Sequence, residues 1–161
     1  MDKIKVGVIG YGGAFNMGRQ HLEPMKNAGM VPVAVCEIDK QRLAVAETDF
    51  PGIKTYDSVD TLVADSEVDL ITIITPHNTH ATLALKCLKA GKHVVLEKPF
   101  AITTDECDIM IAEAKKQEAV LSTYHNRHWD GCIMKAVQEI SKGAIGEVRR
   151  IECHMGGYKK P

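Results

Sequence analysis

The chain has 161 residues, of which 45% are hydrophobic and 25% are charged, and its formal net charge is −1. This length suffices for a domain with a sizeable core, and the near-neutral charge argues against nucleic acid or an acidic membrane surface as a partner. Five scattered cysteines without a C-x-x-C pair, and an amino terminus without the apolar length of a signal peptide, favour a cytoplasmic protein with reduced thiols.

A nearly continuous apolar run predicts the first strand over residues 3–9, and glycines follow it directly. Gly10 and Gly12 match the first two glycines of the dinucleotide fingerprint G-x-G-x-x-G. In that motif the first glycine makes a tight turn, and the second leaves room for a pyrophosphate against the backbone. We expect both glycines to contact a pyrophosphate, although a strand, a glycine turn and a helix also occur together in many other folds.

The third glycine of the fingerprint is displaced. Phe15 occupies its position, and the next glycine is Gly18, which indicates a three-residue insertion before the helix predicted over residues 17–28. Asn16 is the predicted N-cap, so the free N–H groups of the helix would face the phosphates. We expect residues 14–17 to bulge beyond the pyrophosphate, over the cofactor or toward the substrate.

Strands and helices alternate along the chain from residue 3 to residue 124. The further strands are predicted over residues 31–37, 53–56, 69–75, 93–97 and 120–124, and the helices between them over residues 39–48, 58–65, 79–90 and 103–117. Apolar strands with short connections predict an α/β fold with a doubly wound parallel sheet, that of a Rossmann domain. Such sheets bind ligands at the carboxyl ends of their strands, so the functional residues should directly follow the strands.

The last part of the chain, residues 125–161, is predicted to contain a helix that begins at His128 or Asp130 and a strand over residues 147–155. A lone strand at a terminus has no partner unless something else pairs with it. We therefore interpret residues 1–124 as a dinucleotide-binding Rossmann domain, and residues 125–161 as the connecting helix and first strand of a truncated second α/β domain.

Glu37 ends the second predicted strand. A carboxylate there can accept hydrogen bonds from both hydroxyls of an adenosine ribose, and it would repel a 2′-phosphate. The next residue, Ile38, offers no positive charge to hold such a phosphate. The sequence therefore favours NAD over NADP, while the simpler alternative is that Glu37 begins a turn with Asp39.

The loop after the fourth predicted strand holds Thr75, Pro76, His77 and His80. These residues bring polar groups and a rigid turn to the carboxyl edge of the sheet. His77 and His80 also form an H-x-x-H pair, and residues 125–128 form a second one. Zinc bound by the two pairs is an alternative that we consider weak, because such sites usually include a cysteine or carboxylate in a closed set. No metal site is therefore predicted.

Glu97, Lys98 and Pro99 follow the fifth predicted strand, and Asn126 and Arg127 follow the sixth. Beside a cationic nicotinamide, the Lys98 ammonium would give up its proton more easily, so it could donate or accept a proton at a substrate hydroxyl. A surface ion pair beside a turn is the alternative. Asn126 is in a position to reach a bound ligand.

Taken together, these motifs resemble the Gfo/Idh/MocA family of NAD(P)-dependent oxidoreductases. The order of motifs matches: G-x-G with a later G-x-x-H, an acid after strand two, T-P-x-x-x-H, E-K-P and an Asn-Arg turn. The residues that we expect at the cofactor on this basis are Gly10, Tyr11, Gly12, Gly13, Ala14, Asn16, Met17, Glu37, Ile38, Thr75, Pro76, His77, His80, Glu97, Lys98 and Asn126.

The resemblance implies a Rossmann domain followed by an α/β substrate domain, and hydride transfer between the nicotinamide and a carbon that bears a hydroxyl. The substrate would be a sugar, polyol or inositol, with Lys98 as the catalytic residue, and the full-length protein would be a homo-oligomer. A fragment without the second domain would bind NAD and turn over little. A non-catalytic NAD sensor is the competing interpretation, and Lys98 argues against it.

Overall fold

The computed structural model describes residues 3–12, 17–154 and 156 of the chain, which forms two units, Met1–Tyr124 and His125–Pro161. The first unit is built on a parallel sheet with the strand order β3-β2-β1-β4-β5-β6. Its strands are β1 (Lys5–Ile9), β2 (Val31–Cys36), β3 (Lys54–Tyr56), β4 (Leu70–Ile73), β5 (His93–Leu96) and β6 (Leu121–Thr123). Successive strands are added in one direction from β1 to β3 and in the other from β4 to β6, so the predicted doubly wound fold is confirmed.

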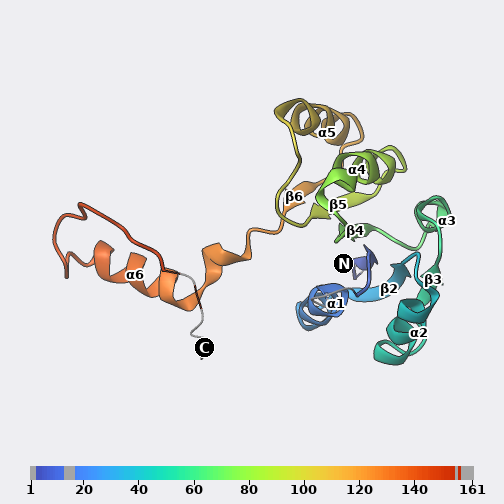
Figure 1. The fold of residues 1–161 in the computed structure, drawn as a ribbon, viewed down its shortest axis with the longest axis horizontal. Helices are drawn as coiled ribbons and strands as arrows, with labels where there is room; N and C mark the ends of the chain where they lie inside the picture. Colours follow the sequence, from blue (N-terminus) through green and yellow to red (C-terminus); the bar gives the residue numbers. More distant parts are fainter. Residues whose placement is uncertain (1–2, 13–16, 155, 157–161) are drawn as a thin grey trace, which may run out of the picture. The chain divides into compact units, whose positions relative to one another are not determined.

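Each crossover between strands contains a helix (Figure 1). The helices of the first unit are α1 (Met17–Asn27), α2 (Lys40–Asp49), α3 (Val59–Ala64), α4 (His80–Lys89) and α5 (Thr104–Lys116), and a short 3-10 turn, η1 (His77–Thr79), precedes α4. Side chains cap α2 and α5, whereas Asn16, the N-cap predicted for α1, lies outside the described residues. Asp39 accepts a hydrogen bond from Gln41 N, and Thr103 and Glu106 form a reciprocal capping box at α5.

The sheet is buried on both faces, which explains its nearly unbroken apolar strands. Side chains alternate across each strand. Val6 and Val8 of β1 pack in one core cluster with Leu22 of α1, whereas Ile9 belongs to a second cluster with Leu88 of α4. Helices α1 and α2 thus contribute to the first cluster, and α3, α4 and α5 to the second. In Figure 1, α4 and α5 lie next to each other, away from α1 and α2.

The second unit contains the 3-10 turn η2 (Asn126–Trp129) and helix α6 (Gly131–Ser141). The strand predicted over residues 147–155 is wrong for the described part of that range, since residues 147–154 adopt no strand. The physical reason is the one that makes isolated strands rare: a strand needs a neighbour for its backbone N–H and C=O groups, and no described segment pairs with this one. Within the described residues, no helix is long and apolar enough to cross a membrane.

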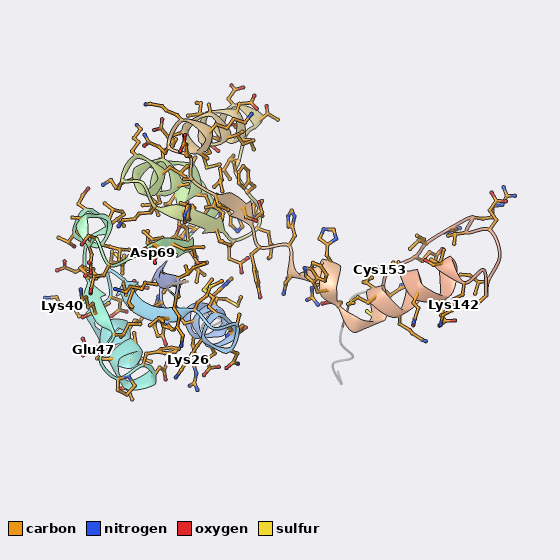
Figure 2. All side chains as sticks on the ribbon, turned by 180° about the vertical axis from the view of Figure 1, so that it is seen from behind. Lys26, Lys40, Glu47, Asp69, Lys142 and Cys153 are labelled. Carbon is orange, nitrogen blue, oxygen red and sulfur yellow. The ribbon has the colours of Figure 1, made fainter. Side chains whose placement is uncertain are left out.

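Asp69, labelled in Figure 2, directly precedes β4 and therefore lies at the amino ends of the parallel strands, the edge opposite to the predicted site. Asp69 Oδ2 accepts a hydrogen bond from Lys5 N at 2.7 Å, which joins the starts of β4 and β1. Near it, Asp65 Oδ2 accepts hydrogen bonds from the Tyr56 hydroxyl at 2.6 Å and the Lys54 ammonium at 2.9 Å. This edge is therefore held by polar contacts between elements far apart in the sequence.

The Asp65 cluster makes the stability of the fold depend on pH. The Tyr56 hydrogen bond, the Glu67 N–H and the Lys54 ammonium hold the pKa of the Asp65 carboxyl well below its usual range. A carboxyl with a lowered pKa in the folded state contributes stability above its unfolded pKa of about 4, and this contribution is lost as the pH falls below that value. We expect the free energy of unfolding, measured with urea, to decrease as the pH falls from about 5 to about 2.

The variant Asp65→Asn should lower the free energy of unfolding at the higher pH and reduce its decrease toward the lower pH. Tyr56→Phe removes the largest cause of the shift and should give an intermediate result. An Asp65→Asn protein whose stability changes with pH as much as that of the wild type would show that this cluster is not responsible.

Candidate functional site

The carboxyl ends of the central strands are level with one another. Ile9 of β1 is paired with Cys36 of β2 and with Ile73 of β4, Ile73 is paired with Leu96 of β5, and Leu96 with Thr123 of β6. The residues that follow these strand ends form one row along the edge of the sheet, in the order Glu37, Gly10, Ile74, Glu97 and Tyr124. The sheet thereby brings together residues from most of the motifs that the sequence singled out.

Gly10 makes the turn at the end of β1. Its φ of +96° lies in a region that residues with a Cβ rarely adopt, and its N–H donates to Cys36 O at 2.8 Å. An added Cβ would lie only 2.5 Å from Ile74 O. Gly12 also has a positive φ, +125°. Neither glycine has a side chain of its own, so a ligand can approach the backbone of the turn closely beside Arg42, the side chain nearest to Gly12.

Gly18, in the first turn of α1, provides the close packing that the third glycine of the fingerprint normally allows. A Cβ on Gly18 would lie 2.5 Å from Tyr11 Cδ2 and 3.1 Å from Gly10 O. The displaced glycine thus still lets the helix press against the glycine turn. The insertion lengthens the loop between them without separating the helix from the strand.

Tyr11 was expected at the cofactor, but its side chain is buried in the core between β1, α1 and α2. Its hydroxyl donates to Asp49 Oδ2 at 2.7 Å, and Asp49 also pairs with Arg19. Burial and the Asp49 carboxylate raise the pKa of Tyr11, so the hydroxyl stays protonated. The side chain anchors the glycine turn, and only the Tyr11 backbone faces the edge of the sheet.

Glu37 connects the glycine turn to the end of β2. One oxygen of its buried carboxylate accepts from Tyr11 N at 2.8 Å, and the other accepts from Ile38 N at 2.8 Å and Asp39 N at 3.1 Å. A carboxylate has about four acceptor positions. These three bonds therefore leave about one position for a ligand hydroxyl, fewer than the two that the sequence suggested.

Arg42 is a residue that the sequence reasoning missed. Its Nη1 lies 3.9 Å from Glu37 Oε2 and its Nε 3.5 Å from Asp39 Oδ2, and its side chain lies against Gly12. The signal was available, because Arg42 is three residues beyond Asp39, the N-cap of α2, and so faces the same side of the helix start. The edge therefore carries a positive charge that Ile38 does not supply.

A groove of about 600 Å³ opens along this edge of the first unit. It is lined by Ile9, Gly10, Gly12, Cys36, Glu37, Ile38, Arg42, Asp57, Val59, Ile74, Thr75, Pro76, Thr79 and Leu83. The predicted residues among these are the two glycines, Glu37, Ile38, Thr75 and Pro76. Burial raises the pKa of the Cys36 thiol to about 11, so Cys36 lines the groove as a neutral group rather than a nucleophile.

The loop after β4 is ordered by its own side chains. The hydroxyls of Thr75 and Thr79 are 2.6 Å apart. His80 is fully buried, with Nδ1 2.9 Å from Pro99 O and Nε2 3.0 Å from Thr75 O, whereas His77 is exposed. Both ring nitrogens of His80 face carbonyl oxygens, so neither points at a ligand. Among the described residues, no group of three or more His, Cys, Asp or Glu is arranged to hold a metal ion.

The turn after β5 separates Glu97 from Lys98. One Glu97 oxygen lies 2.8 Å from Nε2 of the buried His21, and the other accepts from Lys98 N at 3.0 Å. The Lys98 side chain is exposed, and no carboxylate in the described ranges forms an ion pair with its ammonium. The expected alternative of a Glu97–Lys98 surface ion pair is therefore wrong, since the carboxylate is held by other partners.

The remaining predicted residues divide into two groups. Gly13, Ala14 and Asn16 lie outside the described residues, and with them most of the bulge expected over residues 14–17. Met17 is the first residue of α1 and is half-buried, outside the lining of the groove. Asn126 begins η2 in the second unit and is exposed.

The groove satisfies the steric and polar requirements of the adenosine half of a dinucleotide. It combines a glycine turn with no room for a Cβ at Gly10, a buried acid at the end of the neighbouring strand, and a position at the switch point between β1 and β4. Its apolar lining by Ile38, Val59 and Leu83 suits a flat aromatic base. The residues present therefore fit such a ligand.

Comparisons with known proteins give the same indication. The model of a family described as "Oxidoreductase family, NAD-binding Rossmann fold" matches residues 4–125. The uncharacterized oxidoreductase YdgJ of Escherichia coli (strain K12) is 35% identical over 158 residues, which are 98% of this chain and 44% of that protein.

Two further matches bear on cofactor and fold. The scyllo-inositol 2-dehydrogenase (NADP(+)) IolW of Bacillus subtilis (strain 168) is 28% identical over 159 residues, or 99% of this chain and 43% of that protein. The crystal structure of an NAD-binding protein from Listeria innocua is similar with a TM-score of 0.82 and 32% identity, over 91% of this chain and 42% of that one. The chain thus spans less than half the length of these relatives.

Proposed function

Because the chain belongs to the Gfo/Idh/MocA family of oxidoreductases with an NAD-binding Rossmann fold, we propose that it is the cofactor-binding half of an NAD-dependent enzyme. That enzyme would transfer a hydride between NAD(H) and a hydroxyl-bearing carbon of a sugar, polyol or inositol-like compound. The observation that carries the proposal is the row at the sheet edge, where the glycine turn, Glu37 and Glu97 follow strands that end level with one another. The inositol class is supported by the name of one relative, IolW.

The roles of the residues follow from their places along this row. Gly10 and Gly12 would lie against the pyrophosphate, Glu37 would accept a ribose hydroxyl, and Thr75 and Pro76 would line the path toward the nicotinamide. When bound, the nicotinamide supplies the position that accepts or gives the hydride. The Lys98 side chain, exposed and without an ion-pair partner in the described residues, would donate a proton to the substrate oxygen as an ammonium or accept the hydroxyl proton as an amine.

The groove contains one charged group that favours NAD and another that favours NADP. The buried Glu37 carboxylate favours a free ribose and repels a 2′-phosphate, whereas Arg42 could pair with such a phosphate. Arg42 already lies between two carboxylates, those of Glu37 and Asp39. Its positive charge is thereby balanced, so we propose NAD as the cofactor and expect NADP to bind more weakly.

The division into two units supports a matching division of labour. Residues 1–124 would bind the cofactor, and residues 125–161 would be the connecting helix and the beginning of a substrate domain, through which the full-length protein would form homo-oligomers. Cys36 and Cys87 are buried free thiols, which suits a reducing cytoplasm.

Calorimetric titration of the 161-residue chain tests the cofactor proposal. We expect NADH to bind one site per chain, and NADPH to bind the same site with lower affinity. Because Arg42 is the group available to a 2′-phosphate, Arg42→Gln should weaken NADPH binding more than NADH binding. Well-folded protein that shows no heat of binding with either nucleotide would contradict the proposal, and tighter binding of NADPH would reverse the cofactor preference.

Turnover tests the role of Lys98. In a longer protein that includes these residues and a substrate domain, we expect polyol-dependent formation of NADH, and Lys98→Ala should reduce kcat by about 100-fold or more, as expected for loss of a general acid–base group. Lys89→Ala, which removes an exposed lysine of α4, is the control and should leave kcat unchanged. NADH binding without turnover of any polyol would favour the non-catalytic sensor.

A further inference from the structure

We propose that His21 and His80 are positioning residues that hold the turn Glu97–Lys98–Pro99 from two sides and thereby fix the backbone from which the Lys98 side chain extends. This inference rests on the proposed role of Lys98. It assigns a function to His21 of the G-x-x-H pattern, which had none, and a different function to His80 of the T-P-x-x-x-H pattern, which the sequence placed at the cofactor.

His21 reaches the turn from α1. It is 2% exposed, and its Nε2 lies 2.8 Å from Glu97 Oε1. The second oxygen of the same carboxylate accepts from Lys98 N at 3.0 Å. The ring of His21 also packs against Tyr124, with 4.3 Å between the ring centres. Because His21 fixes one carboxylate oxygen, it fixes the direction from which the other binds the backbone of Lys98.

His80 reaches the turn from α4. It is completely buried, with Nδ1 2.9 Å from Pro99 O and Nε2 3.0 Å from Thr75 O. A neutral ring donates through one nitrogen, and a doubly protonated ring donates through both. In either state the ring lies between the loop after β4 and the turn after β5. Since Thr75 lines the groove, His80 connects the groove wall to the turn that carries Lys98.

The two contacts hold the backbone on both sides of Lys98 while leaving its side chain exposed. Residue 97 and the N–H of Lys98 are fixed through His21, and the carbonyl of Pro99 is fixed through His80. No described carboxylate pairs with the Lys98 ammonium, so the contacts that the structure shows act on the backbone from which this side chain extends. This arrangement fixes the point from which the Lys98 side chain reaches toward a bound hydroxyl, which narrows the positions that its terminal nitrogen can take.

The test observes Lys98 directly in the cofactor-free chain. The chain is labelled with ¹⁵N, and the signal that is followed is the backbone amide of Lys98, whose N–H donates to Glu97 Oε2. We expect His21→Phe and His80→Phe to move this signal toward the position of a solvent-exposed amide, because each variant loosens the turn in which Lys98 N donates to Glu97. His21→Gln keeps an N–H donor for Glu97 and should restore the wild-type signal. His80→Gln, which keeps one donor, is measured as well and replaces His80→Phe if that variant unfolds.

His93→Gln is the matched control. His93 is at the start of β5, where its Nδ1 accepts from Val120 N. Its loss therefore disturbs β5 at its amino end, whereas the turn that carries Lys98 follows its carboxyl end. A merely structural role for the two histidines predicts that all the variants lose stability while the Lys98 signal stays in place. That result, or an equal displacement in His93→Gln, would overturn the inference.

An NADH titration of the same samples separates the inference from the proposed function. If wild-type protein binds no NADH while the Lys98 signal responds as expected, the proposed function fails and the positioning by the two histidines stands. If NADH binds and the Lys98 signal is the same in the folded His21 and His80 variants, the positioning fails.

Discussion

Gly10→Ala is expected to abolish NADH binding and to destabilise the first unit strongly. A non-glycine residue at the φ of +96° costs about 1–3 kcal/mol. The added Cβ would also lie 2.5 Å from the backbone oxygen of Ile74, so β1 and β4 would have to separate at the edge where the groove opens. Urea unfolding measures the loss of stability, and calorimetry with NADH measures the loss of binding.

Gly29→Ala is the matched control for this variant. Gly29 also has a positive φ, +90°, but nothing lies within 4 Å of the position of its Cβ. The Gly29→Ala variant should therefore lose only the stability that corresponds to placing a non-glycine residue at a positive φ. It should bind NADH like the wild type. If Gly10→Ala lowered stability no more than Gly29→Ala and kept its affinity for NADH, the close approach of the glycine turn to β4 would have no functional consequence.

Glu37→Gln is expected to weaken NADH binding by about 10- to 100-fold, the range that corresponds to losing a hydrogen bond to a charged group. The variant replaces a carboxylate that binds Tyr11 N, Ile38 N and Asp39 N with an amide that has a single acceptor oxygen. It also removes a negative charge beside Arg42. The ratio of the NADPH to the NADH affinity should consequently rise, which calorimetry with both nucleotides measures.

Glu47→Gln is the control for the change of charge. Glu47, labelled on α2 in Figure 2, accepts a hydrogen bond from the Thr55 hydroxyl at 2.9 Å and lies outside the groove. This variant should leave both affinities unchanged. An affinity of Glu37→Gln for NADH within twofold of the wild-type value would show that Glu37 holds only the protein backbone.

The fold could be predicted from local patterns because its determinants are local. The signals that determine its helices and strands each act within a few residues. They are the continuous apolar runs of the strands and helix caps such as Asp39 and the capping box at Thr103. The predicted strand at residues 147–155 fails for the complementary reason, since its formation depends on a partner that the described residues do not provide.

The candidate site could be predicted in outline, because the residues that follow parallel strands meet at one edge of the sheet. Where their side chains point could not be predicted, since that depends on tertiary contacts. Tyr11 lies between two motif glycines, yet its side chain turns into the core because Asp49, far away in the sequence, accepts its hydroxyl. Glu97 precedes Lys98, yet its carboxylate is held by His21 of α1.

The position of Arg42 on α2 could have been predicted from the sequence spacing alone. Its place at the start of α2 follows from the cap at Asp39, but its contact with the groove depends on how closely α2 approaches Gly12. The side chain bears directly on the choice between NAD and NADP. The sequence prediction considered only Ile38, the residue after Glu37, and therefore underestimated the positive charge near the proposed ribose site.

The most direct test of the central claim is an NMR titration of the ¹⁵N-labelled chain with NADH, in which backbone amide signals are followed one by one. The account predicts saturable shifts of Gly10, Gly12, Glu37, Ile38 and Thr75, which line the groove. Gly52 and Gly91, whose surroundings lie outside that lining, should not move. Shifts confined to the opposite edge, around Lys5 and Asp69, or no saturable shifts at all, would contradict it.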